Sequence, residues 1–242
     1  MTWLDIKVSD WPIIQECINE GDMDGIICHL HDISQEKLDD MDYEEGCELR
    51  DSFAFILQPI PRLNKKELGE LHLMDFNSIE FGAFMDLEYF LTKDQNWMDN
   101  IFSILPILWR KKTKTDDGWY GDEFEKYNNF SKSRKNYFSD FLWVDVYGGL
   151  MDYLDYRDRL YKNYEGMFDV VEQITEEEVV RMTAEERKEV ELQRRIQKWG
   201  FELLLLKLSQ NDPLRMGDAM ELPLARAFNI LAMMHELKIN HE

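Results

Sequence analysis

The residues best suited to metal chemistry lie close together near the N-terminus. Cys28, His29 and His31 carry the thiol and imidazole groups that Zn²⁺ prefers as ligands. On a helix, side chains two residues apart point to different sides, so His29 and His31 could share an ion only on a strand or loop. We therefore expect one buried thiol and two surface imidazoles here, and no metal site.

Carboxylates are the other abundant reactive group, and the stretch from Asp39 to Glu45 holds five of them. A carboxylate pair does acid–base work only when burial separates the two pKa values. A dense acidic run is more typical of a solvated surface, with weak divalent-ion binding as a minor alternative. The segment Asp22–Gly25 looks like the start of a calcium loop, but no glutamate stands at the twelfth position of that loop.

No sequence motif points to catalysis. The chain contains no GxxxxGK[ST] phosphate loop, no GxGxxG, no HExxH and no GxSxG. Its three cysteines, Cys17, Cys28 and Cys47, form no CxxC pair, which argues against a zinc knuckle and a disulfide framework. We therefore expect a protein that is not an enzyme and uses no cofactor.

The charge balance restricts the class of partner. The formal net charge is −21, and the first 50 residues hold fourteen acids against three cations. Such a field repels phosphate backbones and anionic lipid, so we expect neither direct nucleic-acid binding nor membrane docking. The start of the chain lacks the features of a signal peptide, and the apolar stretches are too short to cross a bilayer. A reducing cytoplasm is the expected location.

Periodicity and capping residues predict a mainly α fold, an irregular multi-helix bundle with a short N-terminal strand or hairpin. The strand is expected at Trp3–Val8. The first helix should begin at Ser9 or Asp10 and stop at Gly21. Further helices are expected to begin at Asp22 or Asp24, at Ser34, and near Tyr43, the last of these ending at Leu57 before Pro59.

The middle of the chain predicts helices separated by polar turns. A short helix and a loop are expected over Asn64–Asn77. Two helices are expected next, at 78–91 and at about 96–110, and Pro106 should kink the second. A polar hairpin or loop should follow from Lys111 to Asp122. An aromatic-rich helix is then expected at 131–168, with an interruption around Gly148-Gly149.

The last third predicts one or two long helices from Thr175 to Leu208, charged at first and apolar later. Asn211-Asp212-Pro213 should end them, and Leu222-Pro223 should begin a final helix. The expected division is a helical part at 1–170 with an acidic first segment, and a part at 171–242 with the charged helix and the apolar C-terminal helices. A single domain is nearly as well supported.

Aromatic and methionine side chains predict a contact surface for another protein. Seven tryptophans and 13 methionines exceed the needs of a modest helical core. Methionine repacks against varied partners, and tryptophan is enriched in binding hot spots. The residues expected to bind a partner are Phe81, Phe84, Met85, Trp97, Ile101, Leu105, Trp109, Trp199 and Phe228.

Two basic clusters, at 110–114 and 132–135, interrupt the acidic background. Local balance to neighbouring acids is the favoured interpretation. The alternative is an electrostatic contact with an acidic partner, or with the acidic segment of a second copy in a homo-oligomer.

Several segments spread along the chain form one pattern. They are Phe81-Gly82-Ala83-Phe84-Met85-Asp86-Leu87, the helix that closes at Leu108-Trp109-Arg110, the pair Trp199-Gly200, the break at Asn211-Asp212 and the step Leu222-Pro223-Leu224-Ala225. Together these segments resemble phage tail assembly chaperones. Lys111-Lys112 stands where that pattern has a proline. The resemblance implies a protein of the host cytoplasm that shields the apolar helices of a tail or tape-measure component until it polymerises.

Three alternatives to this function remain. The chain could be a structural or packaged component of the virion, present there at fixed stoichiometry. It could instead be an acidic inhibitor that mimics nucleic acid, which requires carboxylates spaced like phosphates on one rigid face. An enzyme is the least favoured, because the sequence offers no nucleophile–base pair or ligand set.

Overall fold

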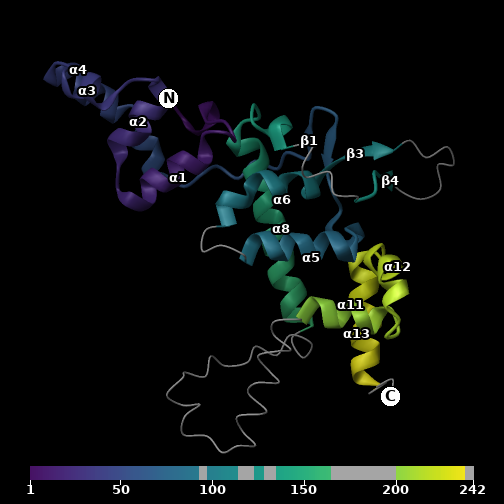
Figure 1. Cartoon of the computed structure of the whole chain (residues 1–242). Coiled ribbons are helices and arrows are strands. Elements are labelled where there is room, and N and C mark those ends of the chain that lie inside the picture. Colours follow the sequence, from purple (N-terminus) through teal and green to yellow (C-terminus); the bar gives the residue numbers. More distant parts are fainter. Residues whose placement is uncertain (93–96, 114–122, 128–134, 165–199, 238–242) are drawn as a thin grey trace, which may run out of the picture. The chain divides into compact units, whose positions relative to one another are not determined.

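The structure is a computed structural model that describes residues 1–92, 97–113, 123–127, 135–164 and 200–237. The expected mainly α fold is confirmed, with a small antiparallel sheet added to the helices (Figure 1). The chain divides into two compact units, and each combines two separate stretches of sequence. Unit 1 comprises residues 1–74 and 87–155, and unit 2 comprises residues 75–86 and 156–242. The expected boundary at residue 170 lies outside the described residues.

Four helices fold from the acidic first segment of unit 1 (Figure 1). They are α1 (Trp11–Glu20), α2 (Met23–His31), α3 (Gln35–Asp39) and α4 (Tyr43–Asp51). Asp22, Ser34 and Asp42 cap α2, α3 and α4 by accepting hydrogen bonds from backbone N–H groups. Asp10 is the N-cap residue of α1, and Gly21 ends that helix with a φ of 74°. The predicted helix starts are therefore confirmed.

The N-terminal strand and the end of the fourth helix were predicted wrongly. Trp3–Asp5 forms a 3₁₀ turn, η1, because Thr2 and Asp5 cap each other's backbone N–H groups. Only Lys7 pairs in the manner of a strand, in an isolated antiparallel bridge to Leu142. Helix α4 stops before the fully buried Phe53, and a separate 3₁₀ turn, η2 (Ala54–Leu57), follows.

A β-hairpin replaces the helix that was expected within Asn64–Asn77, and it forms half of a four-stranded antiparallel sheet. The strands of this sheet are β1 (Glu67–Leu68), β2 (Leu71–Leu73), β3 (Trp109–Thr113) and β4 (Glu123–Phe124), and the 3₁₀ turn η3 (Phe76–Ser78) follows β2. Leu68 pairs with Leu71 across a two-residue turn in which Gly69 has a φ of 60°. That left-handed conformation suits glycine and this type of hairpin.

The helix expected at 96–110 is shorter than predicted. The 3₁₀ turn η4 (Trp97–Asn100) leads into α6 (Ile101–Leu108), and β3 begins at Trp109. Pro106 lies inside α6 and removes one backbone donor close to the helix end. Pairing of Leu73 with Trp109 then draws the chain into the sheet. The predicted hairpin after the helix is confirmed by the antiparallel pairing of β3 with β4, while its turn at 114–122 lies outside the described residues.

Helix α8 (Trp143–Asn163) runs without a break through Gly148-Gly149, where an interruption was predicted. The two glycines allow close packing instead. A Cβ atom at Gly148 would lie 1.8 Å from the backbone oxygen of Leu63, and one at Gly149 would lie 2.5 Å from the Trp109 ring. Both separations are far below van der Waals contact, so the absent side chains are what allow the backbone and the indole to approach α8.

Residues 59–66, which we call the strap, are held along α8 by ion pairs on either side of this contact. Asp145, Gly148, Asp152 and Asp155 are spaced three or four apart, so they share one face of the helix. The pairs are Lys65–Asp145 at 2.5 Å, Arg62–Asp152 at 2.6 Å and Arg62–Asp155 at 2.6 Å. The strap is thus fixed by a close backbone contact and by charge, although most of its residues are exposed.

The core of unit 1 is aromatic as well as aliphatic. Trp11 stacks on Trp143 with ring centroids 4.6 Å apart and planes within 9° of parallel. Trp3 packs against Trp11 at 5.9 Å, and its indole N–H donates to the backbone oxygen of Gln58. Every residue of α6 except Phe102 is buried. Four of the seven tryptophans, Trp3, Trp11, Trp109 and Trp143, are therefore buried in the chain's own core.

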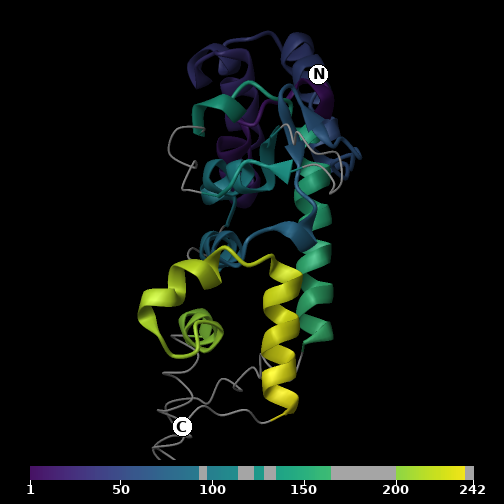
Figure 2. The ribbon, with the colours of Figure 1, turned by 90° about the vertical axis from the view of Figure 1, so that its right-hand side faces the viewer.

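Unit 2 is built around a group of phenylalanine rings. Its elements are the first turns of α5 (Phe81–Thr92), the end of α8, α11 (Gly200–Leu208), η7 (Pro213–Arg215), α12 (Met216–Met220) and α13 (Leu224–Glu236). Helix α13 runs beside the last turns of α8 (Figure 2), where the Tyr164 hydroxyl donates to Asn229. The predicted start of the final helix at Leu222-Pro223 is confirmed, since Pro223 is its N-cap residue.

The long charged helix expected from Thr175 falls mostly at 165–199, outside the described residues. Its expected apolar end is confirmed as α11. The predicted stop after it is also confirmed, because Gln210 and Asn211 adopt left-handed φ values of 59° and 60° and Asp212 caps the next turn.

Candidate functional site

A pocket of about 400 Å³ lies on the N-terminal helices of unit 1. Its lining combines half-buried apolar side chains with exposed polar ones. The lining residues are His31, Ile33, Met41, Glu45, Glu48, Leu49 and Ser52. This mixture of apolar side chains and carboxylates suits contact with another polypeptide.

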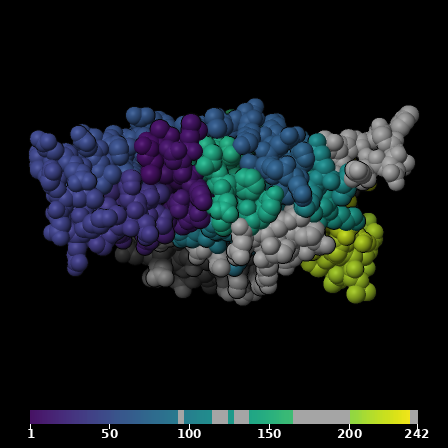
Figure 3. All heavy atoms as spheres, turned by 90° about the horizontal axis from the view of Figure 1, so that it is seen from above, coloured from purple at the N-terminus to yellow at the C-terminus, as the bar shows by residue number. Residues whose placement is uncertain are grey.

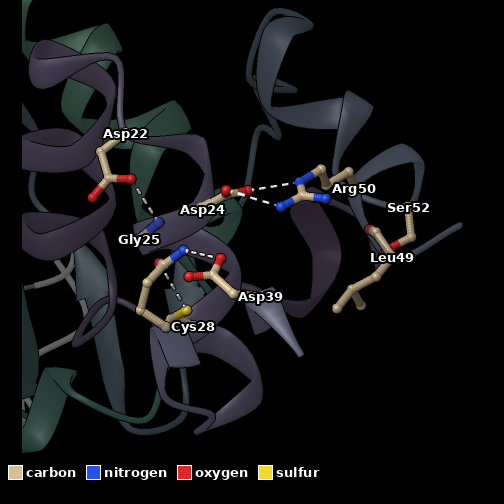
Figure 4. A network of polar contacts seen from close by, with 9 residues as sticks. Asp22, Asp24, Gly25, Cys28, Asp39, Leu49, Arg50 and Ser52 are labelled. Carbon is tan, nitrogen blue, oxygen red and sulfur yellow. Dashed lines mark hydrogen bonds and ion pairs between the residues drawn. The ribbon is translucent and has the colours of Figure 1, made fainter. Parts of the chain in front are cut away.

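Helix α4 supplies one wall of the pocket. Glu45, Glu48, Leu49 and Ser52 are spaced at i, i+3, i+4 and i+7, so they lie on one face of that helix. The Ser52 hydroxyl donates to the Leu49 backbone oxygen at 2.7 Å and satisfies one of the carbonyls at the helix end (Figure 4). This face presents one apolar and two acidic side chains, one turn apart.

The opposite face of α4 is tied to α2. The Arg50 guanidinium donates through Nε and Nη2 to the two oxygens of Asp24, at 2.8 and 3.0 Å (Figure 4). This two-point contact fixes the orientation of both helices. Because Arg50 is committed to Asp24, it does not neutralise Glu45 or Glu48, and neither of those carboxylates forms an ion pair with any residue that the structure describes.

The polar contacts of α2 separate the residues that were considered as metal ligands. The Cys28 thiol lies 3.6 Å from the Gln35 amide oxygen, while His29 faces Asp10 at 3.3 Å. His31 points elsewhere, with its ring edge-on to Phe53 at 5.4 Å. Within the described ranges, no group of three or more His, Cys, Asp or Glu residues is arranged to hold a metal ion.

The Asp24–Arg50 pair predicts a modest dependence of stability on pH. Hydrogen bonding from Arg50 lowers the pKa of Asp24 from its usual 3.8. A carboxyl whose pKa is depressed by folding stabilises the fold above 3.8, and this contribution is lost as the pH falls through the folded value. Because both side chains are partly exposed, we expect Asp24→Asn to cost about 0.5–1 kcal/mol at neutral pH.

Urea unfolding of wild type and Asp24→Asn across the acid range measures this effect. The difference in the free energy of unfolding should shrink below pH 3.8, where the wild-type carboxyl also becomes neutral. Glu16→Gln, an exposed change on α1, is the control and should leave stability nearly unaltered. An Asp24→Asn effect that persists undiminished in acid would show that the charge of Asp24 is not its cause.

In several other groups the pKa moves further from 7. Burial raises the pKa of the Cys17 and Cys28 thiols above the usual 9.0. Burial, with a smaller effect of Asp75, raises the pKa of Tyr156 to about 12. Hydrogen bonding from Lys111 lowers the pKa of Glu70. General acid–base catalysis instead uses groups whose pKa is shifted toward the pH at which the enzyme works.

The residues expected to bind a partner lie mostly in the two cores. Six of them are fully buried: Phe81, Phe84, Ile101, Leu105, Trp109 and Phe228. Met85 and Trp97 are half-buried, and Trp199 lies outside the described residues. The six buried side chains are therefore packed inside the chain itself and are not part of an exposed contact surface. Sequence reasoning missed the pocket residues, whose one visible signal was the helical spacing of Glu45, Glu48 and Leu49.

Within the first basic cluster, Lys111 balances a nearby acid, as the favoured interpretation had it, while Arg110 is buried. The buried Arg110 guanidinium donates to the backbone oxygens of Ile107 and Glu125 and lies over the Tyr127 ring. Lys111 forms an ion pair with Glu70. Most of the second cluster lies outside the described residues.

No protein-family model matches this sequence, and no curated protein or solved structure matches it significantly. Among the residues described, no helix combines the length and the apolar character needed to span a bilayer.

Proposed function

We propose that this chain is a non-catalytic assembly factor that binds a segment of another protein, in the manner of the phage tail assembly chaperones that its sequence resembles. Its client would be a tail or tape-measure component, held before polymerisation. The observation that supports this proposal most directly is the pocket on α2–α4, whose lining includes the apolar Ile33, Met41 and Leu49 and the acidic Glu45 and Glu48.

The charge of the chain is consistent with such a role. A net charge of −21 keeps a complex with an apolar client dispersed, because like-charged particles repel one another. The first 50 residues, coloured purple to blue in Figure 3, hold fourteen acids against three cations and so supply much of this charge.

Capture of the client tests the proposal. The tagged full-length chain is isolated from infected host cells, and the bound proteins are identified by mass spectrometry beside purified virions. We expect an apolar, helical tail or tape-measure protein to be captured, and the chain itself to be missing from the virion. A Leu49→Asp variant should capture several-fold less of that client, because it places an uncompensated charge in the pocket.

Two outcomes would contradict the proposal. Finding the chain in purified virions at fixed stoichiometry would favour the structural-component alternative. Capture of a basic nucleic-acid-binding protein, released by added DNA, would favour the mimic of nucleic acid. A Thr2→Ala variant, altered on unit 1 outside the pocket lining, is the control for nonspecific loss of capture.

A further inference from the structure

The carboxylates beside the pocket carry a charge that the described part of the chain does not neutralise. Glu45 and Glu48 are exposed, stand one turn apart on α4 and form no ion pair with a described residue. The nearest cation along the helix, Arg50, is held by Asp24 at 2.8 Å. The surrounding segment adds to this negative charge, since fourteen of the first 50 residues are acids and three are cations.

The apolar side chains that line the pocket restrict the partner further. Ile33, Met41 and Leu49 are half-buried and have room beside them for additional apolar atoms. A volume of about 400 Å³ lies at the lower end of the roughly 300–1,000 Å³ range of binding pockets. It therefore suits one or two large side chains of a polypeptide. Burial of each such side chain contributes to affinity in proportion to the apolar area covered.

The backbone around the pocket favours a helical partner over an extended one. Addition of a strand requires an exposed strand edge with unpaired N–H and C=O groups. The pocket residues belong to α2, α4 and the connections beside them, and none belongs to a strand. A partner must therefore supply its own backbone hydrogen bonds, as a helix does.

We infer that the α2–α4 pocket takes a basic amphipathic helix, whose large apolar side chain enters beside Leu49 while lysine or arginine residues one turn away pair with Glu45 and Glu48. The spacing matches, because side chains three or four apart on a helix lie side by side, as the two glutamates do on α4. The inference rests on the proposed function and names the chemistry of the client segment.

A synthetic peptide tests this inference on the full-length chain. The probe is a fluorescently labelled helix of roughly 20 residues, with leucines on one face and lysines flanking them. Its binding is measured by anisotropy near physiological salt. Two matched peptides replace either the lysines with glutamates or the central leucines with serines. We expect the lysine–leucine peptide to bind at least about tenfold more tightly than each of the other two.

Charge-reversed variants assign the binding to the pocket. Glu45→Lys/Glu48→Lys should weaken the lysine–leucine peptide about tenfold. Glu16→Lys/Glu20→Lys alters the charge by the same amount on α1, outside the pocket lining, and should weaken it by less than about twofold at this ionic strength. Circular dichroism confirms that both variants keep the helical content of the wild type.

Equal losses in the two variants, or equal affinity for the glutamate peptide, would overturn the inference. Either result can be separated from failure of the proposed function. If the chain captures a tail protein but does not bind the basic peptide, the proposed function stands and the inferred chemistry of the client segment is wrong. If the chain binds the basic peptide but captures no client, the inferred ligand of the pocket stands and the proposed function is wrong.

Discussion

Replacing Gly148 with alanine is expected to lower the free energy of unfolding by about 3 kcal/mol or more. The added Cβ atom would lie 1.8 Å from the backbone oxygen of Leu63 and 2.8 Å from its carbonyl carbon. A flexible side chain could turn away from such a contact, but here the obstacle is main chain. Either the strap leaves α8 or the helix moves, and both changes disturb the buried contact between Gly149 and Trp109.

Urea unfolding followed by tryptophan fluorescence measures this loss, because most of the tryptophans lie in unit 1. Gly46→Ala is the matched control. Gly46 also lies inside a helix of unit 1, but its new Cβ atom would meet only the end of Arg50, at an ordinary 3.5 Å. Alanine should therefore be neutral there, or stabilising by up to about 1 kcal/mol. A Gly148→Ala midpoint equal to that of wild type would contradict the packing of Leu63 on α8.

Replacing Phe84 with alanine is expected to cost unit 2 about 3–5 kcal/mol. Its ring is fully buried and contacts those of Phe201 and Phe228 edge-on, with centroids 5.5 and 5.6 Å apart. Truncation removes the apolar area and these ring contacts, and it leaves a cavity between three helices. The substitution also separates two roles for Phe84, because a residue that only contacts a client could be removed without loss of stability.

Thermal and urea unfolding by far-UV circular dichroism measures the effect of this change. Met233→Ala on α13 is the control, since Met233 is 51% exposed and its loss should alter stability by no more than about 0.5 kcal/mol. If Phe84→Ala unfolds at the same urea concentration as Met233→Ala, Phe84 is not the core residue that its burial indicates.

The helix starts could be predicted from the sequence because capping is local. Asp22 and Ser34 accept hydrogen bonds from backbone groups three residues ahead, and Gly21 ends α1 through its own φ of 74°. Pro223 marks the start of α13 for the same kind of reason, since a proline suits the first positions of a helix. No information from distant residues is needed at these points.

The errors arose where distant residues decide the local structure. Trp109 has the spacing of a helical residue, but pairing with Leu73 makes it the first residue of β3. The glycine pair at 148–149 was predicted to interrupt a helix, because its packing against Leu63 and Trp109 is invisible in the local sequence. Only Gly69 gave a local signal of the missed hairpin, as a glycine that opens a two-residue turn.

The candidate site was predictable in part for a related reason. Composition shows how many large apolar side chains the protein has, but it does not show which of them are buried, as Phe84 is. Helical spacing places Glu45, Glu48 and Leu49 on one face of α4. The rest of the pocket comes from the end of α2 and from the connections after α2 and α3, whose positions depend on tertiary contacts such as Asp24–Arg50.

The contact between the strap and α8 also implies a constraint on evolutionary change. Because the backbone of Leu63 lies so close to α8, glycine is the one residue that fits at position 148. The ion pairs Arg62–Asp152 and Lys65–Asp145 are kept only if both partners of a pair are retained or both change together. Divergent relatives should therefore retain the pattern D-x-x-G-G-x-x-D-x-x-D of residues 145–155, preceded by the R-x-x-K of residues 62–65. Where a relative loses an acid of the first motif, a compensating loss in the second is expected, and this covariation would identify kinship that overall similarity no longer reveals.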